Sequence, residues 1–153
     1  MPPSIDPSKP KCQAIFTTLF DEWFSAQSEK VQKRLSEVIT WLEGAGEALA
    51  WPHCESIENY NGDELVQPRE LRKEVDRNPY RIFYVFSEDK KEAWLLSGGY
   101  KTGNPKRFVK EMTRQAEKAH RLHKEELKEE QRKKAQAEIE APVLEDLEER
   151  RHQ

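Results

Sequence analysis

Apolar residues in the first third of the chain follow two successive spacings, which separate the first predicted elements. Residues 12–18 are mostly β-branched and aromatic, a composition that favours a short strand. From Phe20 to Leu42, apolar residues lie three, four or seven positions apart, which is the spacing of an amphipathic helix. Ser28 falls inside this run and is a good helix N-cap residue. We therefore expect one helix, or a helical hairpin, over residues 19–43.

Extended segments dominate the middle of the chain. After an irregular stretch at residues 44–66, three strand-like runs cover residues 68–75, 80–86 and 93–100. The breaks between these runs are short and polar, as in an antiparallel meander. Both faces of the 80–86 run are largely apolar, although it contains Arg81. Since alternate residues of a strand point to opposite faces, this pattern predicts a central strand.

The last third of the chain predicts one long helix. It begins at Asn104, and Pro105 takes the first helical position, where no backbone donor is needed. An early apolar stripe fades into residues 124–134, which are polar all round and carry opposite charges four residues apart. Pro142 is expected to end the helix, and residues 143–153 are expected to form a short acidic helix or an irregular tail. Together these elements predict an α+β fold, with helices packed on an antiparallel sheet.

Length and composition point to a single domain with short extensions. The 153 residues suffice for one hydrophobic core. We divide them into a flexible proline-rich leader at 1–10, a folded domain at 11–123 and a charged helical extension or tail at 124–153. No apolar run reaches the roughly 18–20 residues that span a bilayer, and the N-terminus lacks a secretory signal. Two cysteines are too few for a disulfide scaffold, so we expect a cytoplasmic protein.

Charge is unevenly distributed along the chain. Residues 1–65 carry a net charge of −6, residues 66–124 of +7 and residues 125–153 of −4, within an overall net charge of −3. A basic middle segment favours a surface that contacts phosphate groups. Chance clustering of ordinary surface charge accounts for the same numbers, so charge alone leaves both interpretations open.

Two local motifs suggest sites that their spacing does not support. Residues 98–103 are rich in glycine and contain a lysine, but Asn104 follows where a phosphate-binding loop needs lysine and then serine or threonine. Glu117, His120 and His123 share one helical face, but nothing else in the sequence supplies the remaining ligands of a metal site. A strand end and an exposed helix face are the better interpretations, and we expect no metal site.

A cluster of basic and aromatic residues on the three predicted strands is the stronger candidate. The first strand carries Arg69, Arg72 and Lys73, the second Arg81 and Tyr84, and the third ends in Tyr100 and Lys101. Adjacent antiparallel strands are expected to bring several of these side chains to one concave face. Guanidinium groups bind phosphate in a bidentate manner and aromatic rings stack on unpaired bases, so the cluster favours RNA binding.

The order of these motifs is similar to that of a known toxin superfamily. The sequence contains Glu70-Leu71-Arg72, then Tyr80-Arg81-Ile82-Phe83-Tyr84, then Leu95-Leu96-Ser97-Gly98-Gly99-Tyr100-Lys101-Thr102, and then a helix opened by Asn104-Pro105. In this order they resemble the RelE/ParE superfamily, and most closely the HigB-like, phage-derived branch of type II toxin–antitoxin toxins. The resemblance extends over residues 12–123 in element order.

This resemblance implies an endoribonuclease that needs no metal or other cofactor. Members of the RelE and HigB branches cleave mRNA, usually on the ribosome, by attack of a ribose 2′-hydroxyl on the adjacent phosphate. By position in the motifs, Arg81 would stabilise the phosphate, Arg72 would orient it, and Lys101 would transfer a proton or stabilise charge. The further residues that we expect to contact RNA are Arg69, Lys73, Tyr84, Tyr100, Lys106 and Arg107.

The resemblance also implies partners and leaves two other functions open. The expected partners are mRNA, the ribosome and an antitoxin protein with a helix-turn-helix domain, and no membrane. One alternative is a non-enzymatic inhibitor of DNA gyrase, as in the ParE branch. The other is an inactive interaction module in which the long charged helix is the working part.

Overall fold

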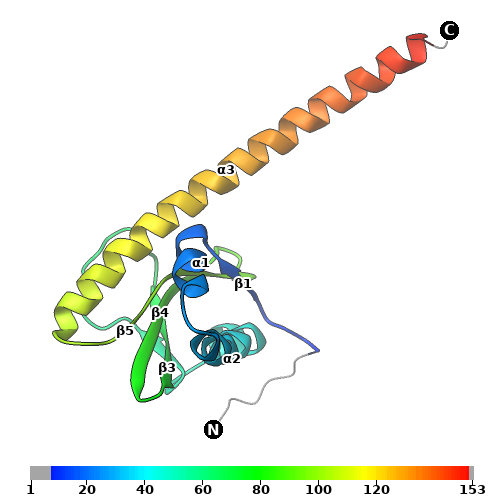
Figure 1. Ribbon diagram of the computed structural model, residues 1–153. Helices are drawn as coiled ribbons and strands as arrows, with labels where there is room; N and C mark the ends of the chain where they lie inside the picture. Colours follow the sequence, from blue (N-terminus) through cyan, green and yellow to red (C-terminus); the bar gives the residue numbers. More distant parts are fainter. Residues whose placement is uncertain (1–7, 152–153) are drawn as a thin grey trace. The chain divides into compact units, whose positions relative to one another are not determined.

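The computed structural model describes residues 8–151 of the chain, so most of the predicted leader at 1–10 lies outside the described residues. The elements follow in this order (Figure 1): β1 (Gln13–Phe16), α1 (Thr18–Ser25), α2 (Glu29–Ala45), η1 (Gly46–Ala48), β2 (Cys54–Ser56), β3 (Arg69–Val75), β4 (Asn78–Phe86), β5 (Glu92–Tyr100) and α3 (Pro105–Arg151). The chain forms two compact units that divide between His120 and Arg121, and each is described by itself.

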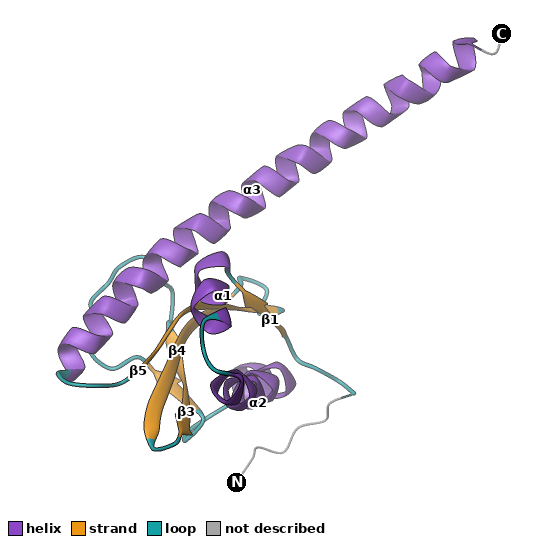
Figure 2. Cartoon of the chain, in the orientation of Figure 1, coloured by secondary structure: helices purple, strands orange, loops and turns teal. Residues whose placement is uncertain are grey.

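A single five-stranded sheet organises the first unit, and the predicted α+β class is confirmed (Figure 2). The strand order is β1-β5-β4-β3-β2, with β3, β4 and β5 forming the expected antiparallel meander. β4 is central, as its two apolar faces predicted. β1 differs from the expectation because it pairs parallel to β5, from Gln13 opposite Glu92 to Phe16 opposite Leu95. The sheet is therefore mixed; the long segment between β1 and β5 makes this parallel pairing possible.

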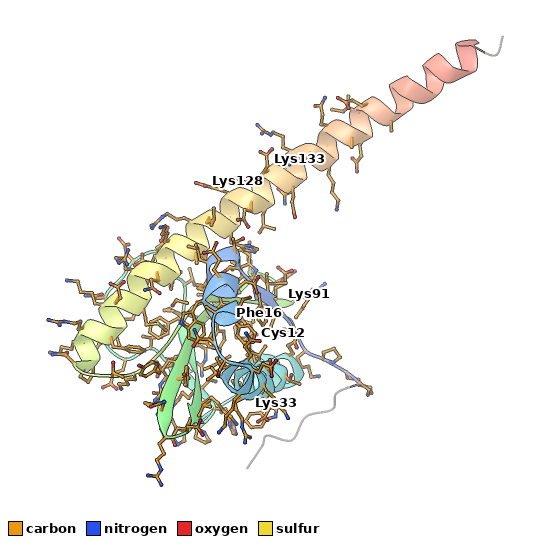
Figure 3. The ribbon with its side chains drawn as sticks, viewed as in Figure 1. Cys12, Phe16, Lys33, Lys91, Lys128 and Lys133 are labelled. Carbon is orange, nitrogen blue, oxygen red and sulfur yellow. The ribbon has the colours of Figure 1, made fainter. Side chains whose placement is uncertain are left out.

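The first helical segment is a hairpin, α1 followed by α2, that covers one face of the sheet. The break falls at Ser28, whose hydroxyl accepts a hydrogen bond from the Val31 backbone N–H at 3.3 Å and caps α2. Phe20 and Leu42 are fully buried in the core that the hairpin forms with β3, β4 and β5. Cys12, labelled in Figure 3, belongs to the same core, and burial raises the pKa of its thiol to about 11.

The first turns of α3 cover the opposite face of the sheet. Asn104 caps this helix, because its side-chain oxygen accepts hydrogen bonds from the backbone N–H groups of Lys106 at 2.9 Å and Arg107 at 3.2 Å. The second core combines Val109, Met112, Ala116 and Ala119 of α3 with Phe83, Val85 and Leu96 of the sheet. The sheet therefore separates two cores, which explains why β4 is apolar on both faces.

The helical part of the second unit continues to Arg151, so the prediction that Pro142 ends the helix is wrong. A proline removes one backbone donor and crowds the preceding turn, which weakens a helix without forcing it to stop. Within this unit Arg132 pairs with Glu129 at 2.5 Å, one turn away. No helix in the described residues is long and apolar enough to cross a membrane.

Candidate functional site

The basic side chains of β3 divide between the two faces of the sheet. Lys73 lies on the side of α2, where its ammonium is 3.3 Å from the Glu37 carboxylate and 4.8 Å from the centre of the Trp41 ring. Arg72 faces the side of α3 and lines a cavity with Phe108. The side chains of the cluster therefore do not all lie on one face of the sheet, because successive residues of a strand point in opposite directions.

Arg72 and Arg81 lie directly opposite each other on β3 and β4 and form the centre of the site. Glu70 lies between them: its carboxylate is 3.4 Å from the Arg72 guanidinium and 3.7 Å from Nε of Arg81. Arg72 also pairs with Glu55 of β2, and Arg81 donates a hydrogen bond to the Tyr80 carbonyl at 2.9 Å. These carboxylates offset the repulsion between two guanidinium groups at opposite positions.

Burial perturbs the ionisation of this network. The side chains of Arg81 and Glu70 are only 8% and 11% exposed. Burial, reinforced by a hydrogen bond with Glu55, raises the pKa of Glu70 to about 7, although Arg81 and Arg72 oppose the shift. Burial and the nearby Arg72 lower the pKa of the Arg81 guanidinium. The Glu70 carboxyl can thus gain or lose a proton near neutral pH, a property often found at functional sites.

Two cavities meet at Arg72 and Trp51. The first, the Lys101 cavity, has a volume of about 500 Å³ and is lined by Lys101, Arg72, Trp51, three glutamates and the first residues of α3. The second, the Trp41 cavity, has about 410 Å³ and is lined by Trp41, Trp51, Pro52, His53, Arg72, Lys73, Glu74 and Arg81. Carboxylates outnumber cations in the first cavity, whereas three cations face one carboxylate in the second. The Trp41 cavity therefore attracts phosphate more strongly.

Trp51 is the functional candidate that sequence reasoning missed. It lies in the loop between η1 and β2, a segment predicted only as irregular, and it is 65% exposed. The Arg72 guanidinium lies 4.5 Å from the centre of its ring, a cation–π contact. The sequence did contain one sign of this residue: a tryptophan lies in a turn-rich segment and belongs to no helical or strand periodicity that would place it in the core.

Tyr84 is a correction to the predicted RNA contacts. It is 1% exposed and lies in the core on the α2 side of the sheet. A buried ring cannot stack on an RNA base, so its predicted contact with RNA is wrong. Sequence alternation alone did not reveal this, because both faces of β4 are covered by helices.

The remaining predicted residues lie around the site at different distances from its centre. Tyr100 is 49% exposed, and its ring is 5.6 Å from that of Tyr80, on the side of the sheet that faces α1 and α2. Arg69 donates a hydrogen bond to the buried Cys54 sulfur at 3.4 Å and lines a third cavity. Lys106 and Arg107 are exposed in the first turn of α3. The structure thus brings together Arg72, Arg81, Lys73 and Lys101, through cavities that share Arg72.

Comparison with known proteins places this site within a family. None of the curated proteins compared with the chain matches its sequence. The family model described as phage derived protein Gp49-like (DUF891) matches residues 22–124. This segment begins in α1, contains β2 to β5 with the whole arginine network, and ends in α3. Since the match covers well over half of the sequence, the chain belongs to the phage-derived Gp49-like family.

Proposed function

We propose that the protein is the toxin of a toxin–antitoxin system and acts in the cytoplasm as an mRNA endoribonuclease. Membership of the Gp49-like family is consistent with a toxin of such a system. The observation that carries the enzymatic proposal is the pair of opposed arginines, Arg72 and Arg81, which both line the cationic Trp41 cavity. Two guanidinium groups at one cavity suit a phosphate that gains negative charge during a reaction.

The proposed reaction is attack of a ribose 2′-hydroxyl on the adjacent phosphorus atom. As the new P–O bond closes the cyclic phosphate, the 2′-hydroxyl gives its proton to water; the bond to the 5′-oxygen of the next nucleotide breaks, and that oxygen takes up a proton and leaves as a hydroxyl. Arg72 contacts the phosphate directly. Arg81 adds positive charge from its buried position next to Arg72. Lys101 stabilises charge or donates the proton to the leaving oxygen. Glu70 is a positioning residue, because its carboxylate contacts both guanidinium groups.

The RNA strand then extends from the arginine pair along further cations. Lys73 provides a contact at the Trp41 cavity, and Lys106 and Arg107 provide contacts at the start of α3. Tyr100 offers an aromatic ring with 49% exposure for a base, and Arg69 lies farther along β3. The proposed partners are translated mRNA on the ribosome and an antitoxin protein that neutralises the toxin.

The test is translation of a defined mRNA in a cell-free system with purified protein, followed by mapping of RNA 5′ ends with and without ribosomes. We expect cuts in translated message, lost in Arg72→Ala and in Lys101→Ala. Lys33→Ala is the matched control, because Lys33 is an exposed lysine on α2 that lines neither cavity of the site. Circular dichroism spectra of all variants check that they fold.

Two results would redirect the assignment. Intact message together with induction of the DNA-damage response in cells would support non-enzymatic inhibition of gyrase. Intact message without any growth effect would support an interaction module, which deletion of residues 124–153 would then examine. Cuts that persist at full rate in folded Arg72→Ala protein would remove the proposed role of the arginine pair.

A further inference from the structure

An exposed indole ring lies at the junction of the two cavities. Trp51 is 65% exposed, compared with 49% for Tyr100 and 37% for Phe16, the other exposed aromatic residues among those that the structure describes. Trp51 lines both the Lys101 cavity and the Trp41 cavity. Most large aromatic side chains of this unit contribute to its two cores, so Trp51 stands apart from them.

One face of this ring is occupied and the other is open. The Arg72 guanidinium lies 4.5 Å from the ring centre and covers one face. Because nearly two thirds of the residue's surface is still accessible, the opposite face is open to solvent. Arg72 is itself held by Glu55 and Glu70, so the guanidinium supports the ring from a fixed position. The result is a preformed flat platform with a cation beneath it.

We propose that Trp51 is a stacking platform for an unpaired nucleobase of the RNA. The ligand class rests on the proposed function, but the platform itself rests on the exposure of Trp51 and its contact with Arg72. A base stacked on the open face of the ring has its own phosphate, or that of its neighbour, close to Arg72, Lys73 and Arg81. Aromatic rings beside cationic grooves are the general means by which proteins bind single strands.

The nature of the ligand follows from the geometry of the platform. Bases within a duplex are stacked on one another and present only their edges, so a flat ring accepts an unpaired base. Every base has a π face, so the platform favours single strands without demanding one sequence. Tyr100 is a poorer platform, because its ring packs against Tyr80 and it has the smaller exposed fraction.

Binding of RNA that cannot be cleaved tests the platform separately from the reaction. The probes are a fluorescently labelled, fully 2′-O-methylated single strand, the same strand in a duplex, and an abasic version without bases. Dissociation constants are measured by fluorescence anisotropy at one salt concentration for wild type, Trp51→Ala, Trp51→Phe and Val66→Ala. Val66 is the matched control because it is an apolar loop residue, 77% exposed, that lines neither cavity of the site.

We expect Trp51→Ala to weaken single-strand binding by roughly tenfold, within the range known for base–aromatic stacking. Trp51→Phe retains most of the affinity, and Val66→Ala retains all of it. Duplex and abasic strands bind wild type and Trp51→Ala equally. The single strand also quenches tryptophan fluorescence in wild type, and Trp51→Phe loses this quenching.

Two outcomes overturn the proposal. Unchanged single-strand affinity in Trp51→Ala removes the platform, and if that variant then binds the antitoxin more weakly, Trp51 belongs to a protein interface. Equal weakening of the abasic strand shows that the ring supports Arg72 and does not stack on a base. The cell-free cleavage assay tests the proposed nuclease function independently of these binding measurements. Base-dependent binding without cleavage contradicts the nuclease proposal only, whereas cleavage with unchanged Trp51→Ala binding contradicts the platform only.

Discussion

Replacement of Glu70 by glutamine removes a carboxyl group that contacts both arginines of the site. Burial raises the pKa of Glu70 from 4.5 to about 7, so between these values the folded protein holds a proton that the unfolded chain has released. This contribution of Glu70 to stability is present in full below about pH 4.5 and is lost as pH rises through about 7. Glutamine has similar size and polar atoms but does not titrate.

The magnitude follows from the pKa difference. One pKa unit corresponds to about 1.36 kcal/mol, so a rise from 4.5 to about 7 corresponds to about 3 kcal/mol of unfolding free energy. Since Glu70 is only 11% exposed, solvent screens this effect little. From pH 4.5 to pH 8, the unfolding free energy of wild type should therefore fall by about 3 kcal/mol relative to that of Glu70→Gln. The corresponding shift in Tm is roughly 6–12 °C for a domain of this size.

The assay is urea denaturation followed by circular dichroism at pH 4.5, 6, 7 and 8 for wild type and Glu70→Gln. Titration of groups that do not interact with Glu70 cancels in the difference between the two proteins, so that difference reports Glu70 together with the Glu55 carboxyl hydrogen-bonded to it. Glu88→Gln is the control, because Glu88 is an exposed carboxylate in the loop between β4 and β5. Parallel pH profiles for wild type and Glu70→Gln would refute the assignment of a raised pKa to this buried carboxyl.

Three further predictions concern the scaffold that holds the site. Gly98→Ala places a methyl group 2.3 Å from the nearest Trp23 ring atom, so we expect a loss of about 1–3 kcal/mol in urea denaturation, partly restored by the smaller ring of Trp23→Phe. Asn104→Ala removes the cap of α3 and should cost about 1 kcal/mol; unchanged stability would mean that the cap contributes nothing. Leu35→Ala leaves a cavity at a fully buried position on the core-facing side of α2 and should cost about 2–5 kcal/mol of unfolding free energy, with a proportional fall in Tm.

Much of the element order was predictable from the sequence. Strand composition and short polar breaks identified the meander, and the two apolar faces of β4 placed it at the centre. Asn104 and Pro105 located the start of α3, and Ser28 marked the break in the helical hairpin. These predictions succeeded because spacing and capping report interactions within one element or between adjacent ones, which the local sequence encodes.

The candidate site was predictable only in part. Arg72, Arg81 and Lys101 were recognised from motifs, and the structure places them around cavities that share Arg72. Tyr84 was misassigned because its burial depends on helices that cover both faces of the sheet. Trp51 was missed because its role depends on Arg72, which is 21 residues away along the chain.

The sequence by itself determined most of the helix and strand segments, although not η1 and β2, and it determined where the hairpin and α3 begin and which residue types were available for a phosphate site. Only the tertiary structure decided that β1 pairs in parallel with β5, that Lys73 faces α2 and Arg72 faces α3, and that Glu70 is buried between two guanidinium groups. The physical reason is that burial and pairing depend on contacts between residues far apart in the chain. Local periodicity reports only whether a segment is helix or strand and which of its residues share a face.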